Sequence, residues 1–126
     1  MIDAPWAAMV LGTADGPDVK VLEGAGSAHA VVWPGMGAQL RSMARVSLPP
    51  GARTLELSHP SDAVYYVIEG GGQVVDGEAG SGEPLVEGSM VHVDRGTPYR
   101  FVGGDAGLEL VGGPAPVDLA LYPEAW

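Results

Sequence analysis

The chain has 126 residues, and its sixteen acidic residues against six basic ones give a formal net charge of −10 at pH 7. A phosphate backbone and an anionic membrane surface would both repel such a chain, so we expect neither nucleic acid nor membrane as a partner. It has no cysteine, which excludes disulfides, thiolate metal sites and cysteine nucleophiles. The length predicts one domain. A signal-peptide pattern and a membrane-length apolar run are both missing, so we expect a cytoplasmic protein.

Short β-branched runs separated by Gly, Pro and Asp predict an all-β domain. The expected strands are, in chain order, 19–22, 29–33, 40–48, 53–59, 64–68, 73–75, 85–86, 90–93, 99–102 and 108–111. The third of these alternates, and it places Leu40, Ser42, Ala44, Val46 and Leu48 on one face. We expect hairpin turns at Gly70-Gly71-Gly72 and at Asp76-Gly77.

Two stretches share a distinctive spacing. The first runs Pro50-Gly51, five residues, Leu57-Ser58-His59, three residues, Ala63, six residues and Gly70. The second runs Gly88, five residues, Asp94-Arg95-Gly96, two residues and Tyr99. This two-part frame resembles the cupin family. The resemblance implies a double-stranded β-helix, or jelly-roll barrel, in a single domain 1–126. Its motif core is expected at about residues 40–112, with N-terminal strands in 1–39 and a tail in 113–126.

The resemblance also implies where a metal ion would lie. In the family, the positions held here by Leu57, His59, Ala63 and Tyr99 are usually His, His, Glu and His, and they bind one metal. Leucine and alanine cannot coordinate, and a catalytic metal needs about three protein ligands. We therefore expect no metal and no other cofactor. Whether His29 or His92 joins a rearranged metal site stays open, although alternation places His92 on the outside.

Alternation along the strands predicts which side chains face the barrel interior. The result is a small, mostly apolar pocket with a few polar groups, which is typical of a small-molecule site. His59 is a candidate general base, and Tyr99 is a candidate acid or hydrogen-bond donor to a developing oxyanion. Arg53 is expected to orient an anionic group. The candidate catalytic residues are His59 and Tyr99, and the candidate substrate-binding residues are Arg53, Tyr65, Leu57, Ala63 and Phe101.

Three functions follow from this pocket. The first is a metal-independent acid–base enzyme of the isomerase, epimerase, cyclase or lyase type; some cupin-fold sugar epimerases resemble it in using a histidine base and a tyrosine acid. The second is a non-catalytic module that binds or senses a small ligand, in which His59 is hydrogen-bonded and silent. The third is a metal-dependent dioxygenase or lyase with rearranged ligands. The resemblance also implies a homodimer. Trp6, Trp33 and Trp126 lie outside the motif region, and they are expected either to cover the outer face of the barrel or to lie at a subunit contact.

Overall fold

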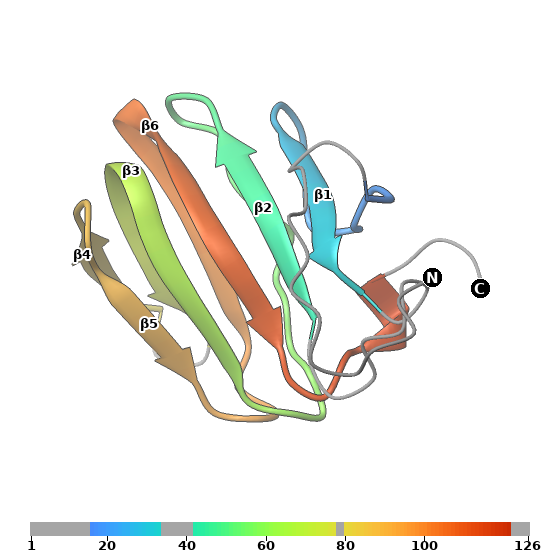
Figure 1. Ribbon diagram of the computed structural model, residues 1–126. Coiled ribbons are helices and arrows are strands. Elements are labelled where there is room, and N and C mark those ends of the chain that lie inside the picture. The colour runs from blue at the N-terminus through green and yellow to red at the C-terminus, as the bar shows by residue number, and fades with distance from the viewer. Residues whose placement is uncertain (1–15, 34–41, 78–79, 122–126) are drawn as a thin grey trace.

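The computed structural model describes residues 16–33, 42–77 and 80–121 (Figure 1). Its strands are β1 (Ser27–Val32), β2 (Met43–Leu48), β3 (Ala63–Asp76), β4 (Gly82–Leu85), β5 (Met90–Val93) and β6 (Tyr99–Pro114), followed by a 3-10 helix at Leu119–Leu121. All pairings are antiparallel, in the order β1-β2-β6-β3-β4, and β5 also pairs with β3. No helix in the described part of the chain has the length and apolar character to span a membrane. Trp6, Leu40 and Trp126 lie outside the described residues.

The two longest strands each take part in both layers of the barrel. Residues 63–70 of β3 pair with β5 and with residues 108–114 of β6. Residues 72–76 of β3 pair instead with β4 and with residues 99–103 of β6. Figure 1 shows both strands bending over at one end of the molecule, so that one half of each lies behind the other half. This arrangement confirms the expected all-β jelly-roll fold.

The bend replaces a hairpin that the sequence predicted at Gly70-Gly71-Gly72. The prediction was wrong, because β3 continues through these glycines with register shifts on both sides of Gly70. Gly70 has a φ of +78°, and a Cβ built on it would lie 2.2 Å from the carbonyl oxygen of Gly107 on β6. Only glycine accepts that conformation and that close approach. The strands expected at 99–102 and 108–111 likewise form one bent strand, β6.

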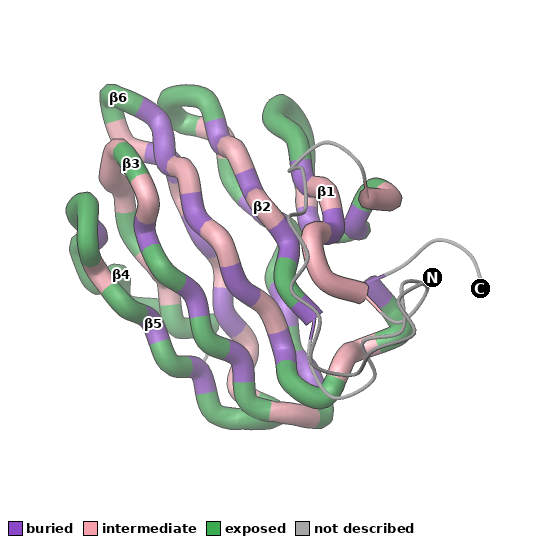
Figure 2. The backbone as a smooth tube through the Cα atoms, viewed as in Figure 1, coloured by how far each residue is buried: buried purple, intermediate pink, exposed green. Residues whose placement is uncertain are grey.

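The core lies between the two layers. In β2 the residues Ala44, Val46 and Leu48 are buried and Met43 is exposed, which confirms the predicted alternation within the described part of that strand. Figure 2 shows the same alternation of buried and exposed positions along the neighbouring strands. Trp33 packs half-buried against this core.

The segment 53–59 departs from the predicted strand. It makes only isolated bridges, at Arg53, Thr54 and Leu57. The hydroxyl of Thr54 donates to Leu55 O and accepts from the Phe101 amide, so a side chain takes the place of a backbone partner. Leu55 and the residue after it are both exposed, so the alternation of inward and outward side chains shifts by one position between Thr54 and Leu57. Leu57 and His59 therefore face inward, whereas Arg53 and Leu55 do not.

Candidate functional site

The backbone of two segments brings His59 and Tyr99 together. Leu57 and Tyr99 exchange a pair of backbone hydrogen bonds, at 2.7 and 2.8 Å. His59 lies two residues beyond Leu57, so its side chain enters the barrel on the same side. Its carbonyl oxygen accepts a hydrogen bond of 2.8 Å from the amide of Gly96, in the turn before β6. The site is thus anchored by main-chain contacts within the two motifs.

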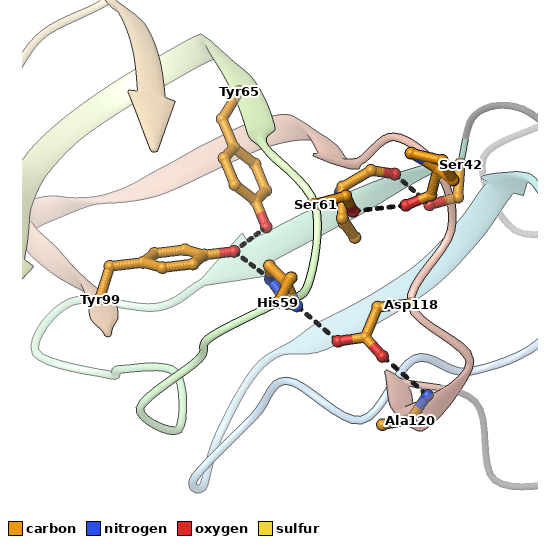
Figure 3. A network of polar contacts seen from close by, with 9 residues as sticks. Ser42, His59, Ser61, Tyr65, Tyr99, Asp118 and Ala120 are labelled. Atoms are coloured by element: carbon orange, nitrogen blue, oxygen red, sulfur yellow. Dashed lines mark hydrogen bonds and ion pairs between the residues drawn. The ribbon is translucent and has the colours of Figure 1, made fainter. Parts of the chain in front are cut away.

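Four side chains form a continuous polar chain inside the barrel (Figure 3). The hydroxyl of Tyr65 lies 2.5 Å from that of Tyr99, and the Tyr99 hydroxyl lies 2.6 Å from Nε2 of His59. Nδ1 of His59 lies 2.8 Å from Oδ2 of Asp118. We call Tyr65, Tyr99, His59 and Asp118 the polar tetrad.

The tetrad is buried among aromatic rings. Tyr99 is 2% exposed, and His59 and Tyr65 are each 4% exposed. The ring of Phe101 packs edge-on against Tyr65 and Tyr99, with centroids 4.8 and 5.6 Å apart. Because buried polar groups are costly unless they are paired, the hydrogen bonds within the tetrad are needed for the fold as well as available for chemistry.

Burial keeps both phenols in their neutral form. Desolvation raises the pKa of Tyr65 to about 12, although its hydrogen bond with Tyr99 acts in the opposite direction. Desolvation also raises the pKa of Tyr99, and the neighbouring Tyr65 and the charge of Asp118 raise it further. At neutral pH both residues are therefore hydrogen-bond donors rather than phenolates.

The structure brings six of the seven predicted site residues together. Leu57 and Ala63, like the rings of the site, are buried. The exception is Arg53, and the prediction that it faces the barrel interior was wrong. Its side chain is 51% exposed and forms an ion pair with Glu23 at 2.7 Å. It cannot orient a substrate inside the barrel. The residues brought together in the interior are Leu57, His59, Ala63, Tyr65, Tyr99 and Phe101.

Asp118 was not predicted from the sequence. It lies in the tail, outside the two motif frames, immediately before the 3-10 helix. The tail is held against the barrel by hydrogen bonds from the Ala115 amide to Asp62 O and from the Lys20 amide to Leu121 O. Its side chain is 12% exposed and therefore only partly buried. A signal for it would have been an acidic residue in an otherwise apolar stretch after the last strand.

The residues at the family's metal position do not fit a metal ion. Leu57 and Ala63 have no donor atoms, and both ring nitrogens of His59 already have partners within the tetrad. The raised pKa of Tyr99 opposes the phenolate that a metal would require. One imidazole and a neutral phenol are fewer than the three ligands of a catalytic site.

The other two histidines are not part of the tetrad. His92 is exposed, as alternation predicted, and its ring lies 3.9 Å from Asp62 and 3.6 Å from Asp94. One potential ligand atom from each of these three exposed residues lies within 4.8 Å of the others. His29 is half-buried, and its Nδ1 lies 3.0 Å from the carboxylate of Asp18. Neither histidine contacts the tetrad.

The chain belongs to the cupin family. The family model for the cupin domain matches residues 44–111, which is just over half of the 126 residues and includes both motif frames. No curated protein matches the chain.

Several solved structures share the fold at low identity. A cupin-like protein from Thermotoga maritima is 22% identical, with a TM-score of 0.69, over 98% of this chain and 88% of that one. The polyketide cyclase RemF from Streptomyces resistomycificus is 21% identical, with a TM-score of 0.65, over 91% and 76%. A predicted oxalate decarboxylase from Thermotoga maritima is 21% identical, with a TM-score of 0.67, over 86% and 100%. At these identities the likeness concerns the fold.

Proposed function

We propose that this cupin binds a small carbonyl compound and acts as a metal-independent acid–base enzyme of the isomerase, epimerase, cyclase or lyase type. The observation that carries the proposal is the buried polar tetrad, in which an imidazole lies between a carboxylate and a phenol. Such a set of buried titratable groups is typical of catalytic sites. The similarity in fold to a polyketide cyclase is compatible with this class of chemistry but does not identify a substrate.

In the proposed reaction, Nε2 of His59 removes a proton from the carbon next to the carbonyl group. The electron pair of that C–H bond moves into the carbonyl group and produces an enolate. The phenol of Tyr99 donates a hydrogen bond to the enolate oxygen. Because its pKa is raised, Tyr99 is better suited to donate this hydrogen bond than to give up its proton. The imidazolium then returns its proton to the same or a neighbouring carbon.

Substrate binding must exchange at least one hydrogen bond of the tetrad. Nε2 of His59 is already paired with the Tyr99 hydroxyl, so the carbonyl oxygen has to accept the Tyr99 hydrogen bond in place of Nε2 before Nε2 is free to act as a base. One surface groove, of about 500 Å³, is lined by residues that include Ser47, Glu69 and Glu109, and by none of the tetrad. We therefore place the reaction in the barrel and not in that groove.

A non-catalytic ligand-binding role is the second candidate. It is favoured by one observation: every member of the tetrad is already hydrogen-bonded to another member. A closed network of this kind also serves as a fully satisfied polar core. In that case ligands would stabilise the fold and leave chemically unchanged.

Deuterium exchange separates the two candidates. Carbonyl compounds that raise the melting temperature of the protein are incubated with it in D₂O, and deuterium at the carbon next to the carbonyl is measured by mass spectrometry. We expect exchange with the wild type, loss of exchange with His59→Gln, and unchanged exchange with the matched control His92→Gln, whose side chain is exposed. Stabilising compounds that are recovered without deuterium would support the binding module instead.

A further inference from the structure

The turn that carries Asp118 holds its carboxylate in one orientation. Oδ1 accepts a hydrogen bond of 3.1 Å from the amide of Ala120, and the Asp118 carbonyl oxygen accepts one of 3.1 Å from the amide of Leu121. Leu121 is buried, and its own carbonyl oxygen accepts a 2.6 Å hydrogen bond from the Lys20 amide. With Oδ1 held by the turn, Oδ2 is the oxygen that faces His59 (Figure 3).

We propose that Asp118 is a positioning residue: it fixes His59 in the tautomer with the proton on Nδ1, and so makes Nε2 the proton acceptor that faces Tyr99. This inference rests on the proposed function only for its catalytic meaning. A carboxylate has acceptors but no donor, so the proton between Asp118 and His59 belongs to Nδ1. In a neutral imidazole, Nε2 then carries the lone pair and accepts from the Tyr99 hydroxyl.

The same reasoning assigns the donor and the acceptor of every hydrogen bond in the tetrad. Once Tyr99 donates its only proton to Nε2, its oxygen can only accept from the Tyr65 hydroxyl. Every donor then has one acceptor, from Tyr65 through Tyr99 and His59 to Asp118. The short tail segment outside the motif frames thus controls the protonation pattern of a site built from the two motifs.

The Asp118→Asn variant is expected to change the tautomer of His59. The Ala120 amide donates to Oδ1, so we expect the carbonyl oxygen of the asparagine to take the place of Oδ1 and its NH₂ group to take the place of Oδ2. That NH₂ group can only donate, so Nδ1 must become an acceptor and the ring proton must move to Nε2. In serine proteases the corresponding change also favours the wrong tautomer and lowers kcat about 10⁴-fold.

The experiment measures the tautomer directly. Long-range proton–nitrogen NMR spectra of protein with ¹⁵N-labelled histidine, near neutral pH, distinguish a protonated ring nitrogen from an unprotonated one. The His59 signals are identified by their loss in His59→Gln. We expect a protonated Nδ1 and an unprotonated Nε2 in the wild type, and the reverse in Asp118→Asn. The matched control is Asp94→Asn, which removes a carboxylate 3.6 Å from His92 and should leave the His59 signals unchanged.

Three results would overturn the inference: the opposite tautomer in the wild type, a doubly protonated ring in the wild type, or a His59 tautomer that Asp118→Asn does not change. If Asp118→Asn does not fold, the wild-type spectrum decides alone. The proposed role of Asp118 and the proposed enzymatic reaction can be rejected independently of each other. The expected tautomer together with unchanged exchange in His59→Gln would reject the proposed enzyme and keep the role of Asp118.

Discussion

Nε2 of His59 lies 2.6 Å from the hydroxyl oxygen of Tyr99, although the two residues are forty positions apart in the chain. Both occupy positions at which the cupin resemblance implies metal ligands, and here the two side chains are hydrogen-bonded to each other. Leu57 and Ala63 fill the other two positions with apolar groups. The four positions therefore hold one polar pair beside two apolar side chains, and this pair determines the chemistry that we propose.

The stability of the tetrad provides the first prediction. Tyr99→Phe removes the hydroxyl that pairs with both Tyr65 and His59, so it leaves two buried polar atoms without a partner. Each such loss costs about 1–3 kcal/mol. Tyr65→Phe removes one of the two hydrogen bonds and should cost less. Urea unfolding measures both variants, with Tyr66→Phe as the control because Tyr66 is 41% exposed.

The informative result is the order of the three variants in their free energy of unfolding. We expect the free energy of unfolding to fall most for Tyr99→Phe, less for Tyr65→Phe, and little for the control. Equal values for Tyr99→Phe and Tyr66→Phe would contradict the paired network.

The raised pKa values of the two phenols predict how stability depends on pH. The pKa of an unfolded tyrosine is close to the ordinary value of 10.0, whereas burial raises the pKa of Tyr65 in the folded state to about 12. Between these values the unfolded state loses the proton that the folded state keeps. The stabilising contribution is therefore fully present below about 10 and is lost as the pH rises toward about 12. Urea unfolding across this range should show a falling free energy, with a shallower fall for Tyr65→Phe. An equal fall in both proteins would contradict the assignment.

The bend between the two layers predicts an unusual sensitivity at one glycine. Gly70 and Gly88 both have positive φ angles, of +78° and +92°. A Cβ at Gly88 meets nothing within 4 Å, whereas a Cβ at Gly70 collides with the backbone of Gly107. Gly88→Ala should therefore cost only the strain of its conformation, about 1–3 kcal/mol. Gly70→Ala should cost clearly more or prevent folding. Similar melting temperatures for the two variants would contradict this account of the bend.

Sequence reasoning identified the interior of the barrel where alternation is regular and failed where a side chain interrupts it. The inward positions of His59, Tyr65 and Tyr99 followed from strand periodicity and from the spacing of the motifs. Arg53 was misplaced because the Thr54 hydroxyl substitutes for a backbone partner and shifts the register, and no propensity scale records such a substitution. Asp118 was missed for a different reason: its contact with His59 depends on how the tail packs against the barrel, a long-range feature that local patterns do not contain.

The donor set at the family's metal position predicts the result of metal analysis. Protein purified without added metal should contain no stoichiometric iron, manganese, nickel or zinc in the barrel, and a chelator should leave its melting temperature unchanged. Potential ligand atoms of the exposed residues Asp62, His92 and Asp94 also lie within 4.8 Å of one another, so metal at that cluster has to be distinguished from metal in the barrel. Elemental analysis of His59→Gln and His92→Gln separates the two locations. Stoichiometric metal that is lost only from His59→Gln would revive the metal-dependent enzyme.

The outer face of the layer built from β2, β3, β5 and β6 is where we expect two copies to meet. Val64, Tyr66 and Met90 are 46%, 41% and 65% exposed, and Tyr66 pairs across the strands with Met90 on one side and Val111 on the other. The nearby Arg45 is neutralised by Glu109 at 2.8 Å. In a chain of net charge −10, the apolar centre of this face is where we expect two identical copies to repel each other least.

Light scattering on the size-exclusion column tests this arrangement. We expect the wild type to have the mass of a dimer and Tyr66→Glu to have that of a monomer, because the new charges would be buried face to face across a two-fold axis. The matched control is Val86→Glu, which places the same charge on a side chain that is 66% exposed in the turn after β4. A monomeric wild type, or a dimer that only Val86→Glu dissociates, would exclude this face as the contact between copies.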